Sequence, residues 1–451
     1  MTGRTPRSVC PICLNPIPAV HETREGETFL VKTCPEHGTF RTVVWRGGPD
    51  FMSWSRPKVP SLPKRPATRV EHGCPLDCGL CEAHRQHTCT AVLEVTWRCD
   101  LGCPVCFASS GKAAPPDPSV AEFESLLQSV ESASGHCNLQ LSGGEPTVRD
   151  DLPDLIGMAK NKGFPFVQLN TNGLRLGREE GYARRLAHAG LDSVFLQFDG
   201  TEDAIYETLR GRPLFKDKLA AIDALADAGV GVVLVPTVMP GVNDHNLGAI
   251  LQLASERSPA VRGVHFQPVS YFGRHPASPT DAQRITLPEV MRKLERQSNG
   301  AVREVDFLPP GCEHSHCSFH ANYMVNEEGG LTKLSAKGGC GCESQPAAKG
   351  ADKAKAFVKR QWAAPENRLP MASNACEDDL DRFLARAATH TLAVSAMAFQ
   401  DAWTLDLERL KGCCIHIVAP DGRLIPFCAY NLTSMDGETL YRGKCHASSC
   451  S

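Results

Sequence analysis

Three closely spaced cysteines form the most chemically informative motif of this sequence. They follow an apolar run at residues 91–97 that predicts a strand, and they stand at a Cx3Cx2C spacing: Cys99, Cys103 and Cys106. Thiolates this close together in a loop can converge on one soft-metal centre. Three ligands in place of four would leave one iron of a [4Fe–4S] cluster open to a substrate or cofactor, as in catalytic metal sites. The alternative is a structural zinc knuckle with a distant fourth ligand.

A second Cx3Cx2C triad lies upstream, at Cys74, Cys78 and Cys81. No strand is predicted before it, and a further cysteine, Cys89, stands eight residues after the last member. We therefore predict an auxiliary [4Fe–4S] cluster held by all four thiols. The strand before Cys99 and the glycine-rich motif after Cys106 favour the later triad as the catalytic one.

The N-terminal segment carries two short knuckles, Cys10-Pro-Ile-Cys13 and Cys34-Pro-Glu-His37. Residues 28–33 between them predict a hairpin strand that brings the knuckles together. A Cys3His set suits tetrahedral zinc or a rubredoxin-type iron. The metal is then either purely structural or an electron-relaying iron.

Further cysteines cluster towards the C-terminus, and four of them predict a second auxiliary cluster: Cys312, Cys317, Cys414 and Cys428. Residues 414–418 and 423–427 flank an Ala-Pro-Asp-Gly turn and predict a β-hairpin. Adjacent strand residues point to opposite faces, so only one of Cys413 and Cys414 should reach this cluster, and we favour Cys414.

Residues 337–355 are rich in Gly, Ala, Lys and Ser and predict a flexible insertion. Cys340 and Cys342 within it form either a redox-active or metal-binding dithiol or an incidental pair.

Between residues 91 and 269 short apolar runs alternate with helical patterns. The predicted strands are 91–97, 137–142, 164–171, 193–199, 231–238 and 262–268, and helices are predicted at 120–132, 152–162 and 219–228. Six βα units predict an α/β fold, a partial (β/α)6 TIM-like barrel with its working loops at the carboxyl ends of the strands. We predict a metal ribbon at 1–58, a linker with the auxiliary motif at 59–90, the barrel at 91–310 and an α+β iron–sulfur domain at 311–451.

Polar motifs follow the predicted strands where such loops would lie. The second strand leads into Ser142-Gly-Gly-Glu145-Pro146, whose glycines allow close backbone approach and whose carboxylate can hold an ammonium group. The next strand ends contribute Asn170, Thr171, Asn172, Gln197, Asp199, Thr237 and Asn243. These polar residues either contact a cofactor or substrate, or serve as turn and capping residues.

Composition narrows the possible classes of protein. The chain has 451 residues, a net charge of −3 and 21 cysteines. The small net charge does not indicate a nucleic-acid-binding surface. No apolar stretch is long enough to predict a transmembrane segment. The N-terminus lacks an apolar signal region, so we expect a cytoplasmic protein. Clustered cysteines in a chain of this kind indicate metal rather than disulfides.

Between residues 91 and 269 the sequence resembles the radical S-adenosylmethionine (SAM) superfamily. The resemblance implies that the Cys99 triad holds a [4Fe–4S] cluster whose open iron binds SAM. It also implies that Gly143, Gly144 and Glu145 grip the methionine amino group and that Asn170, Thr171 and Asn172 contact the SAM ribose or carboxylate. Val105 departs from the aromatic residue often found before the last cysteine, and Phe107 could stack in its place.

Four blocks narrow the resemblance to one group within that superfamily. They are the Cys34 knuckle, the Cys74–Cys89 segment, Pro-Gly-Cys312, and Cys413-Cys-Ile-His with Leu-Ile-Pro-Phe-Cys428. The chain resembles the group that includes archaeal tetraether lipid synthases, dihydro-hydroxymethylpterin methyltransferases and uncharacterised bacterial members. The resemblance implies a rubredoxin-like mononuclear site, one SAM cluster and two auxiliary clusters.

Three functions compete at this point. The leading one is a radical SAM enzyme that forms or alkylates C–C bonds at an unactivated carbon of a small-molecule or lipid substrate. The second is a pterin methyltransferase that uses SAM, and the third is a non-catalytic iron–sulfur electron carrier. Both enzymes would need an external electron donor such as a ferredoxin or flavodoxin.

Overall fold

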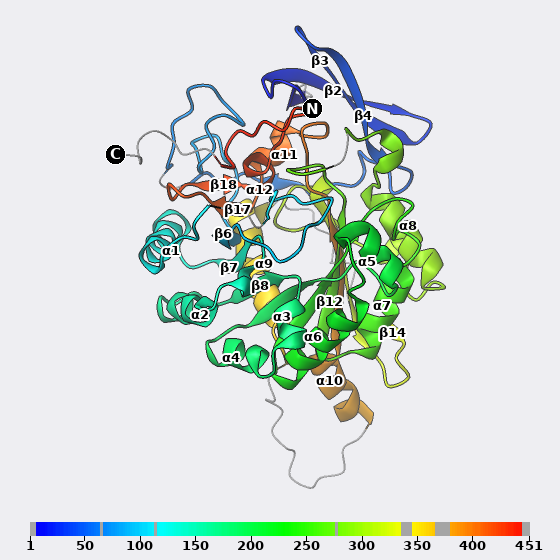
Figure 1. Cartoon of the computed structure of the whole chain (residues 1–451). Coiled ribbons are helices and arrows are strands. Elements are labelled where there is room, and N and C mark those ends of the chain that lie inside the picture. Colours follow the sequence, from blue (N-terminus) through cyan, green and yellow to red (C-terminus); the bar gives the residue numbers. More distant parts are fainter. Residues whose placement is uncertain are drawn as a thin grey trace.

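The computed structural model describes residues 6–63, 66–111, 115–275, 278–334, 345–365 and 379–443, with the side chains of 379 and 380 left out. An antiparallel ribbon stands at the N-terminus and lies above the larger sheet in the view of Figure 1. Its four strands pair in chain order: β1 (Arg7–Val9), β2 (Pro16–Arg24), β3 (Glu27–Cys34) and β4 (Gly38–Arg46). The strand predicted at residues 28–33 is β3.

Six parallel strands form the centre of the molecule, which confirms the predicted (β/α)6 partial barrel. They run in the order of the chain: β6 (Thr90–Thr96), β7 (Asn138–Gly143), β8 (Val167–Thr171), β9 (Ser193–Gln197), β10 (Gly231–Val235) and β12 (Val261–Pro268). The short β11 (Thr237–Val238) also pairs with β12. Each strand lies within a few residues of its predicted position.

The C-terminal part adds strands to both edges of this sheet instead of forming a sheet of its own. At one edge β16 (Thr391–Met397) runs parallel to β12, followed by the antiparallel β13 (Ser318–Val325) and β14 (Leu331–Lys333). At the other edge β17 (Ile415–Val418) runs parallel to β6 and pairs with β18 (Leu424–Pro426). The predicted hairpin is confirmed as β17–β18, and the sheet crosses the predicted boundary at residue 310.

Helices cover the outer face of the barrel (Figure 1). They are α1 (Val120–Ser134), α2 (Leu152–Asn161), α3 (Leu174–Arg178), α4 (Tyr182–His188), α5 (Asp203–Arg210), α6 (Phe215–Asp227), α7 (Leu247–Glu256) and α8 (Leu287–Gln297). A capping box, in which Ser119 and Glu122 satisfy each other's backbone amides, starts α1. The three helices predicted from periodicity correspond to α1, α2 and α6.

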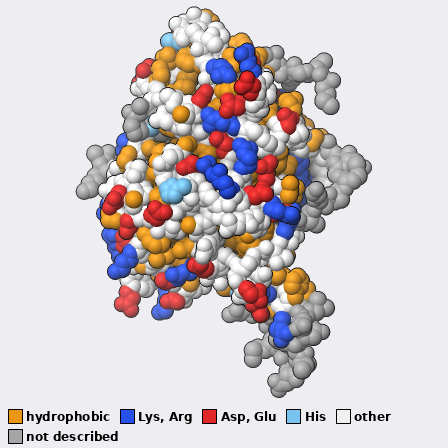
Figure 2. All heavy atoms as spheres, turned by 90° about the vertical axis from the view of Figure 1, so that its right-hand side faces the viewer, with side chains coloured by type: hydrophobic (Ala, Val, Ile, Leu, Met, Phe, Trp, Pro, Cys, Tyr) orange, Lys and Arg blue, Asp and Glu red, His pale blue; other side chains and the backbone are white. Residues whose placement is uncertain are grey.

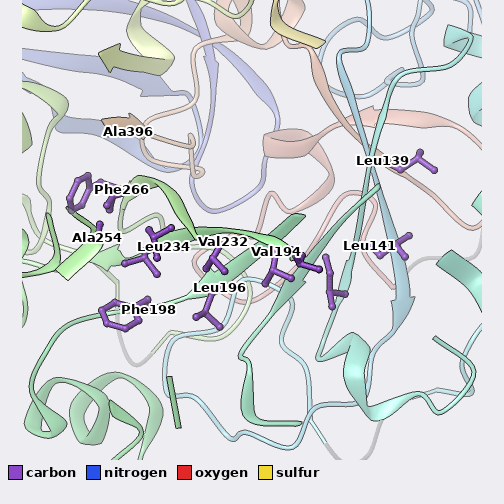
Figure 3. Packing of buried hydrophobic residues seen from close by; sticks show 14 of the residues in the cluster. Leu139, Leu141, Val194, Leu196, Phe198, Val232, Leu234, Ala254, Phe266 and Ala396 are labelled. Carbon is purple, nitrogen blue, oxygen red and sulfur yellow. The ribbon is translucent and has the colours of Figure 1, made fainter. Parts of the chain in front are cut away.

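Strand alternation separates a helix-facing core from a cavity-facing wall. Leu139 and Leu141 of β7, Val194 and Leu196 of β9, and Val232 and Leu234 of β10 belong to one buried cluster, part of which Figure 3 shows. The residues between them, such as Gln140 and Phe195, line a cavity inside the barrel. One face of each strand thus builds the core and the other face builds the site.

A flexible insertion was predicted at 337–355, and helix α9 (Ala347–Trp362) corrects this prediction for residues 347–355. Two of its hydrogen bonds lie at the amino-terminal ends of barrel strands: the backbone carbonyl of Lys355 lies 3.5 Å from Asn138 Nδ2, and Arg262 Nε donates to the Gln361 carbonyl at 3.0 Å. A Cβ on Gly231, the first residue of β10, would lie 2.2 Å from the Trp362 carbonyl oxygen. Helix α9 therefore closes the amino-terminal end of the barrel. The predicted dithiol, Cys340 and Cys342, lies outside the described residues.

Shorter elements complete the chain: β5 (Lys58–Val59), β15 (Gln345–Pro346), η1 (Pro146–Val148), η2 (Asp281–Gln283), η3 (Glu304–Asp306), η4 (Ser315–Cys317), α10 (Asp379–Thr389), α11 (Leu407–Lys411) and α12 (Phe427–Tyr430). On the face shown in Figure 2, basic and acidic side chains are interspersed. None of the described helices is long and apolar enough to cross a membrane.

Candidate active site and metal centres

A cavity of about 810 Å³ runs through the barrel. At the carboxyl ends of the strands it is lined by the three thiols of the Cys99 triad. The predicted strand-end residues line it too, namely Phe107, Gly143, Gly144, Glu145, Asn170, Thr171, Asn172, Gln197 and Thr237. The structure therefore brings the predicted catalytic motif and nearly all the predicted cofactor contacts to this end of the cavity.

The loop that carries the Cys99 triad is held from the opposite side of the barrel. Cys106 and Arg274 exchange backbone hydrogen bonds of 2.9 and 3.0 Å, and Arg274 Nε donates to the Cys103 carbonyl at 3.0 Å. Gly273 adopts φ +54°, and a Cβ there would lie 2.7 Å from the Cys106 carbonyl oxygen. Burial raises the pKa of Cys99 to about 12, so this thiol needs a bound cation to ionise at neutral pH.

The two glycines of the second strand loop are required by close backbone packing. A Cβ on Gly143, whose φ is +129°, would lie 2.0 Å from the Thr96 carbonyl oxygen, and one on Gly144 would lie 2.1 Å from that of Arg98. The amides of Gly144 and Glu145 donate to these two carbonyls at 2.8 and 2.9 Å. The loop after β7 thus lies directly against the chain that leads into the cysteine triad.

Glu145 is buried and organises the neighbouring loops. Its Oε1 accepts hydrogen bonds from the Thr147 amide and hydroxyl and from Thr171 Oγ1 (3.0, 2.7 and 2.6 Å), while Oε2 accepts from the Asn172 amide at 2.6 Å. Burial is the largest influence on its pKa, which is raised. Oε2 has one such donor, which leaves it acceptor capacity.

The polar residues at the end of β8 and in the triad loop divide into two kinds. Asn172 connects the loops, because its Nδ2 donates to Asp100 beside Cys99 at 2.7 Å and its Oδ1 accepts from the Leu174 amide. Asn170 Oδ1 and Ser110 Oγ are buried and have no hydrogen-bond partner among the described residues. Both residues line the cavity, so these two oxygens are free to meet a ligand.

Behind the triad stand two buried cations that the sequence motifs did not indicate. Arg210 makes a two-pronged ion pair with Asp199 (2.7 and 2.8 Å), and Lys218 Nζ donates to the Asn172 carbonyl at 2.5 Å and to Gln197 Oε1 at 3.1 Å. Burial lowers the pKa of Lys218 to about 8. Asp199 and Gln197 are thus engaged with these cations. Neither cation belongs to a local motif, so only the fold reveals them.

Phe107 lies at the cavity edge among aromatic and charged partners. Its ring centroid is 5.8 Å from that of Phe427, and the Arg442 guanidinium lies 5.8 Å from its centre. Arg442 in turn forms a buried ion pair with Glu94 of β6. Phe107 thus belongs to a wall in which the C-terminal segment meets the barrel.

The ribbon brings its four predicted ligands together. The Sγ atoms of Cys10, Cys13 and Cys34 and a ring nitrogen of His37 lie within 4.8 Å of one another. The turn after β1 supplies Cys10 and Cys13, and the end of β3 with the turn after it supplies Cys34 and His37. A site this compact fits one tetrahedral ion, for which Zn–S bonds of about 2.3 Å place the ligands roughly 4 Å apart.

Cys74, Cys78 and Cys81 lie close enough to influence one another. A hydrogen bond from Cys74 is the largest cause that raises the pKa of Cys78, and burial followed by the charge of Cys74 raises that of Cys81. The Tyr441 hydroxyl fixes the loop, since it accepts from the Cys78 amide at 3.0 Å and donates to the Pro75 or Leu76 carbonyl at 2.7 or 2.6 Å.

The structure groups Cys89 with cysteines other than those predicted for it. Its thiol lies within 4.8 Å of those of Cys312 and Cys414, and all three are buried. The reason is strand order: Cys89 precedes β6, Cys414 precedes β17, and these two strands are neighbours in the sheet. Hydrogen bonds from Cys312 and Cys414 hold the pKa of Cys89 well below its usual range.

The predicted C-terminal cluster is likewise divided. Burial raises the pKa of Cys413, and the charges of Cys428 and Cys317 raise it further, so these three thiols lie within electrostatic range of one another. Arg409 Nη2 lies 3.5 Å from Cys317 Sγ, and the Gln400 amide lies 3.3 Å from Cys428 Sγ. The two adjacent cysteines thus belong to different thiol groups. Cys413 is a candidate ligand that the sequence analysis set aside.

Comparisons with known proteins agree with this geometry. The Radical SAM superfamily profile matches residues 93–254, and the profile of the HMPTM N-terminal zinc ribbon domain matches residues 3–46. A 7,8-dihydro-6-hydroxymethylpterin dimethyltransferase of Methanocaldococcus jannaschii is 34% identical over 94% of this chain and 92% of its own length. The chain belongs to the radical SAM superfamily. Within it, the chain belongs to the group of the dihydro-hydroxymethylpterin methyltransferases and is an enzyme.

Other relatives match a smaller part of the chain. A probable GTP 3′,8-cyclase of Methanothermobacter thermautotrophicus is 29% identical over 39% of this chain and 57% of its own length. Among solved structures, SuiB of Streptococcus suis bound to its precursor peptide SuiA matches 48% of this chain and 46% of its own length, at 13% identity and a TM-score of 0.40.

Proposed function

We propose that this radical SAM enzyme is a methyltransferase that acts on a carbon of a pterin-class heterocycle. The observation that carries the proposal is the similarity to a pterin dimethyltransferase, which extends over 94% of this chain and so includes ribbon, barrel and C-terminal strands. Pterin methylation was the second of the three functions considered from the sequence. The electron carrier is set aside because the chain is an enzyme.

At the carboxyl end of the cavity, we assign the cluster to Cys99, Cys103 and Cys106. The free acceptors there, Glu145 Oε2, Asn170 Oδ1 and Ser110 Oγ, suit an ammonium group and hydroxyls, so the residues fit SAM. A bound cluster and SAM supply one-electron cleavage of the sulfonium C–S bond and a 5′-deoxyadenosyl radical. The chain's own contribution is to hold the donor rigidly, through the Gly143–Gly144 packing and the Arg274 contacts, and to keep water out.

Deeper in the barrel, three rings form a wall suited to a flat substrate. Phe195 lies 4.8 Å from Trp362 and 5.6 Å from His265 between ring centroids. Trp362 Nε1 is buried and has no acceptor among the described residues, and it belongs to a side chain that lines the cavity. A heterocycle offers both a flat face for such rings and ring nitrogens or carbonyls for a lone N–H donor.

The lipid-coupling reaction favoured by the sequence analysis is the second candidate. The observation in its favour is the apolar part of helix α9, which lines the cavity with Ala354, Phe357 and Val358. An acyl chain would need such a wall but would leave Trp362 Nε1 unpartnered, which costs free energy. We therefore rank it below the pterin.

The test is anaerobic turnover with dithionite as reductant, with 7,8-dihydro-6-hydroxymethylpterin and a fatty acyl substrate offered separately. We expect a methylated pterin by mass spectrometry and S-adenosylhomocysteine beside 5′-deoxyadenosine, as expected if a second SAM donates the methyl group. The matched variant is Trp362→Phe, which keeps the ring and removes the N–H. It should lower kcat/KM for the pterin about tenfold, the worth of one hydrogen bond. Coupled acyl product without methylated pterin would overturn the proposal.

We further propose that the Cys74–Cys78–Cys81 and Cys317–Cys413–Cys428 groups hold auxiliary clusters. The thiols within each group lie close enough to shift one another's pKa, which supports this assignment. The first electron would come from a ferredoxin- or flavodoxin-like donor. A Cys3His ligand set suits both zinc and iron, so metal analysis must identify the ion in the ribbon.

A further inference from the structure

The cavity opens to solvent at the end of the barrel opposite the Cys99 triad. Its lining there includes three cations, which we call the basic mouth: Arg56, Lys58 and Lys353. Arg56 and Lys353 are exposed and Lys58 is half-buried. The neighbouring lining residues Gln345 and Pro346 are exposed as well. A ligand could therefore enter or protrude at this end only by passing these three charges.

Strand pairing and helix packing place the three cations around one opening. Lys58 of β5 pairs in register with Gln345 of β15, and Lys353 Nζ donates to Gln345 Oε1 at 3.0 Å. A Cβ on Gly311 would lie 3.5 Å from Arg56 Nη1. The carbonyl of the same glycine packs directly against helix α9, which carries Lys353. The basic mouth is thus built from three separate parts of the chain.

The positive charge of the basic mouth is not neutralised by its own contacts. Lys58 Nζ donates to the Glu313 carbonyl. Arg56 Nη1 lies 3.5 Å from the Pro309 carbonyl oxygen, and the acceptor of Lys353 is an amide oxygen. Among the described residues, one carboxyl group lines this end of the cavity, that of Glu313. Even if Glu313 is ionised, three positive charges face one negative charge, which leaves an excess of two.

A phosphate group matches this excess better than a carboxylate does. A phosphate ester carries about −1.5 to −2 charges at pH 7 and offers three strong acceptor oxygens. Each ammonium group has three donors and the guanidinium has five, so donors remain after the contacts above. The next turns of α9 line the cavity with apolar side chains, Ala354, Phe357 and Val358. An anionic group would therefore stay at the mouth while an uncharged part extends inward.

We propose that the basic mouth binds a phosphate group of the substrate, whose uncharged part extends through the barrel towards the Cys99 triad. Since β6 has seven residues, the two ends of the barrel are on the order of 20 Å apart along the strand. A substrate anchored at the mouth is therefore elongated. For a pterin, which rests on the proposed function, the phosphate is an ester of the hydroxymethyl arm. A phospholipid headgroup presents the same phosphate chemistry.

Binding to the full-length enzyme, reconstituted anaerobically, tests the phosphate subsite. The ligands are inorganic phosphate, 7,8-dihydro-6-hydroxymethylpterin, its phosphate ester, and glycerol 3-phosphate as a soluble lipid headgroup. The proteins are wild type, Lys58→Met, Lys353→Met and the control Lys359→Met, which removes an exposed cation in the last turn of α9. Isothermal titration calorimetry gives the affinities. Iron content and SAM cleavage with dithionite verify that each variant is folded.

The ester should bind to the wild type about tenfold more tightly than the free pterin, and Lys58→Met and Lys353→Met should each lose about tenfold in affinity for the ester, the worth of one charge-assisted hydrogen bond. Both variants should keep the wild-type affinity for the free pterin, and Lys359→Met should keep both affinities. Inorganic phosphate should compete with the ester and not with the free pterin. Equal affinity of the wild type for ester and free pterin would overturn the proposal. So would ester binding that is unchanged in both mouth variants.

Glycerol 3-phosphate separates the two sources of the phosphate. If it binds more tightly than the pterin ester and is lost in the same two variants, the phosphate subsite stands and belongs to a lipid headgroup. Because binding is measured without turnover, the subsite can fail while pterin methylation succeeds, and the reverse.

Discussion

The two cysteine triads have identical spacing, so the residues around each triad must show which one is assigned to SAM. Both are Cx3Cx2C motifs, but only Cys99, Cys103 and Cys106 line the cavity beside the Glu145 loop. The loop of Cys74, Cys78 and Cys81 is instead fixed by Tyr441 from the C-terminal segment. Spacing alone is therefore insufficient to assign the SAM site, and location in the fold discriminates between the triads.

Substitution of each triad by alanine tests this assignment. The Cys99/Cys103/Cys106 triple variant should produce no 5′-deoxyadenosine above background and should keep the iron of the other clusters, because it removes only the ligands that face the cavity. The Cys74/Cys78/Cys81 triple variant should still cleave SAM with dithionite. The measurement is chromatographic quantification of 5′-deoxyadenosine. If SAM cleavage survives loss of the first triad, the SAM site must be assigned to the second.

Lys218 predicts a pH dependence of stability. Burial lowers its pKa in the folded protein to about 8, from an ordinary value of 10.5. Between these two pH values the unfolded chain binds more protons than the folded chain, so the free energy of unfolding rises with pH across that window. The full effect is about 3 kcal/mol at 1.36 kcal/mol per pKa unit.

Urea unfolding at pH 7.5 and 10.5 measures this effect for the wild type, Lys218→Met and Lys216→Met. The rise should be smaller by about 3 kcal/mol in Lys218→Met, which has no proton to lose at this site. Lys216 is exposed on the same helix, so its variant should follow the wild type. Identical pH profiles for wild type and Lys218→Met would contradict the shift.

Among the helices and strands, local sequence patterns were sufficient to predict those that do not depend on distant parts of the chain. Short apolar runs between helical patterns predicted β6 to β12 because the strands of a parallel barrel are largely buried, and the turn at residues 419–422 predicted the β17–β18 hairpin. The predicted grouping of Cys89 was wrong. Cys89 meets Cys414 because β17 lies beside β6, a contact between residues more than 300 positions apart. Helix α9 was missed because its Ala and Lys content suggests disorder, although both residues favour helix.

Gly144 tests how tightly the elements of the site must pack. An alanine Cβ there would lie 2.1 Å from the Arg98 carbonyl oxygen, which is backbone and has no rotamer to change. Gly144→Ala should therefore displace the triad loop, weaken SAM binding at least tenfold and lower the melting temperature. The control is Gly157→Ala in α2, where the nearest atom is 4.0 Å away. It should be neutral or stabilising by up to about 1 kcal/mol. Equal SAM affinity in both variants, measured by equilibrium dialysis, would refute the packing argument.

At the scale of the whole molecule, three parts of the chain are connected through buried polar contacts. The ribbon reaches the loop after β16 through Lys32, whose Nζ donates to the Ala402 carbonyl at 2.7 Å. It reaches the barrel through Arg46, which donates to the carbonyls of Asp281 and Arg284. The C-terminal segment reaches β6 through the Arg442–Glu94 ion pair. The ribbon is thus anchored at two places, far along the chain from the cysteine triad.

Ribbon metal should therefore matter for stability and electron delivery more than for SAM cleavage. Cys13→Ser removes one of four ligands of a compact site, and structural metal affinity contributes directly to folding free energy. The full-length variant should lose one metal ion and no acid-labile sulfide, and its melting temperature should fall. Cleavage of SAM with dithionite should stay within about twofold of wild type, because the Cys99 triad lies on a separate loop. Arg24→Met, which alters an exposed ribbon side chain, is the control and should change neither metal content nor melting temperature. Loss of sulfide together with the ion in Cys13→Ser would show instead that the ribbon holds or supports a cluster.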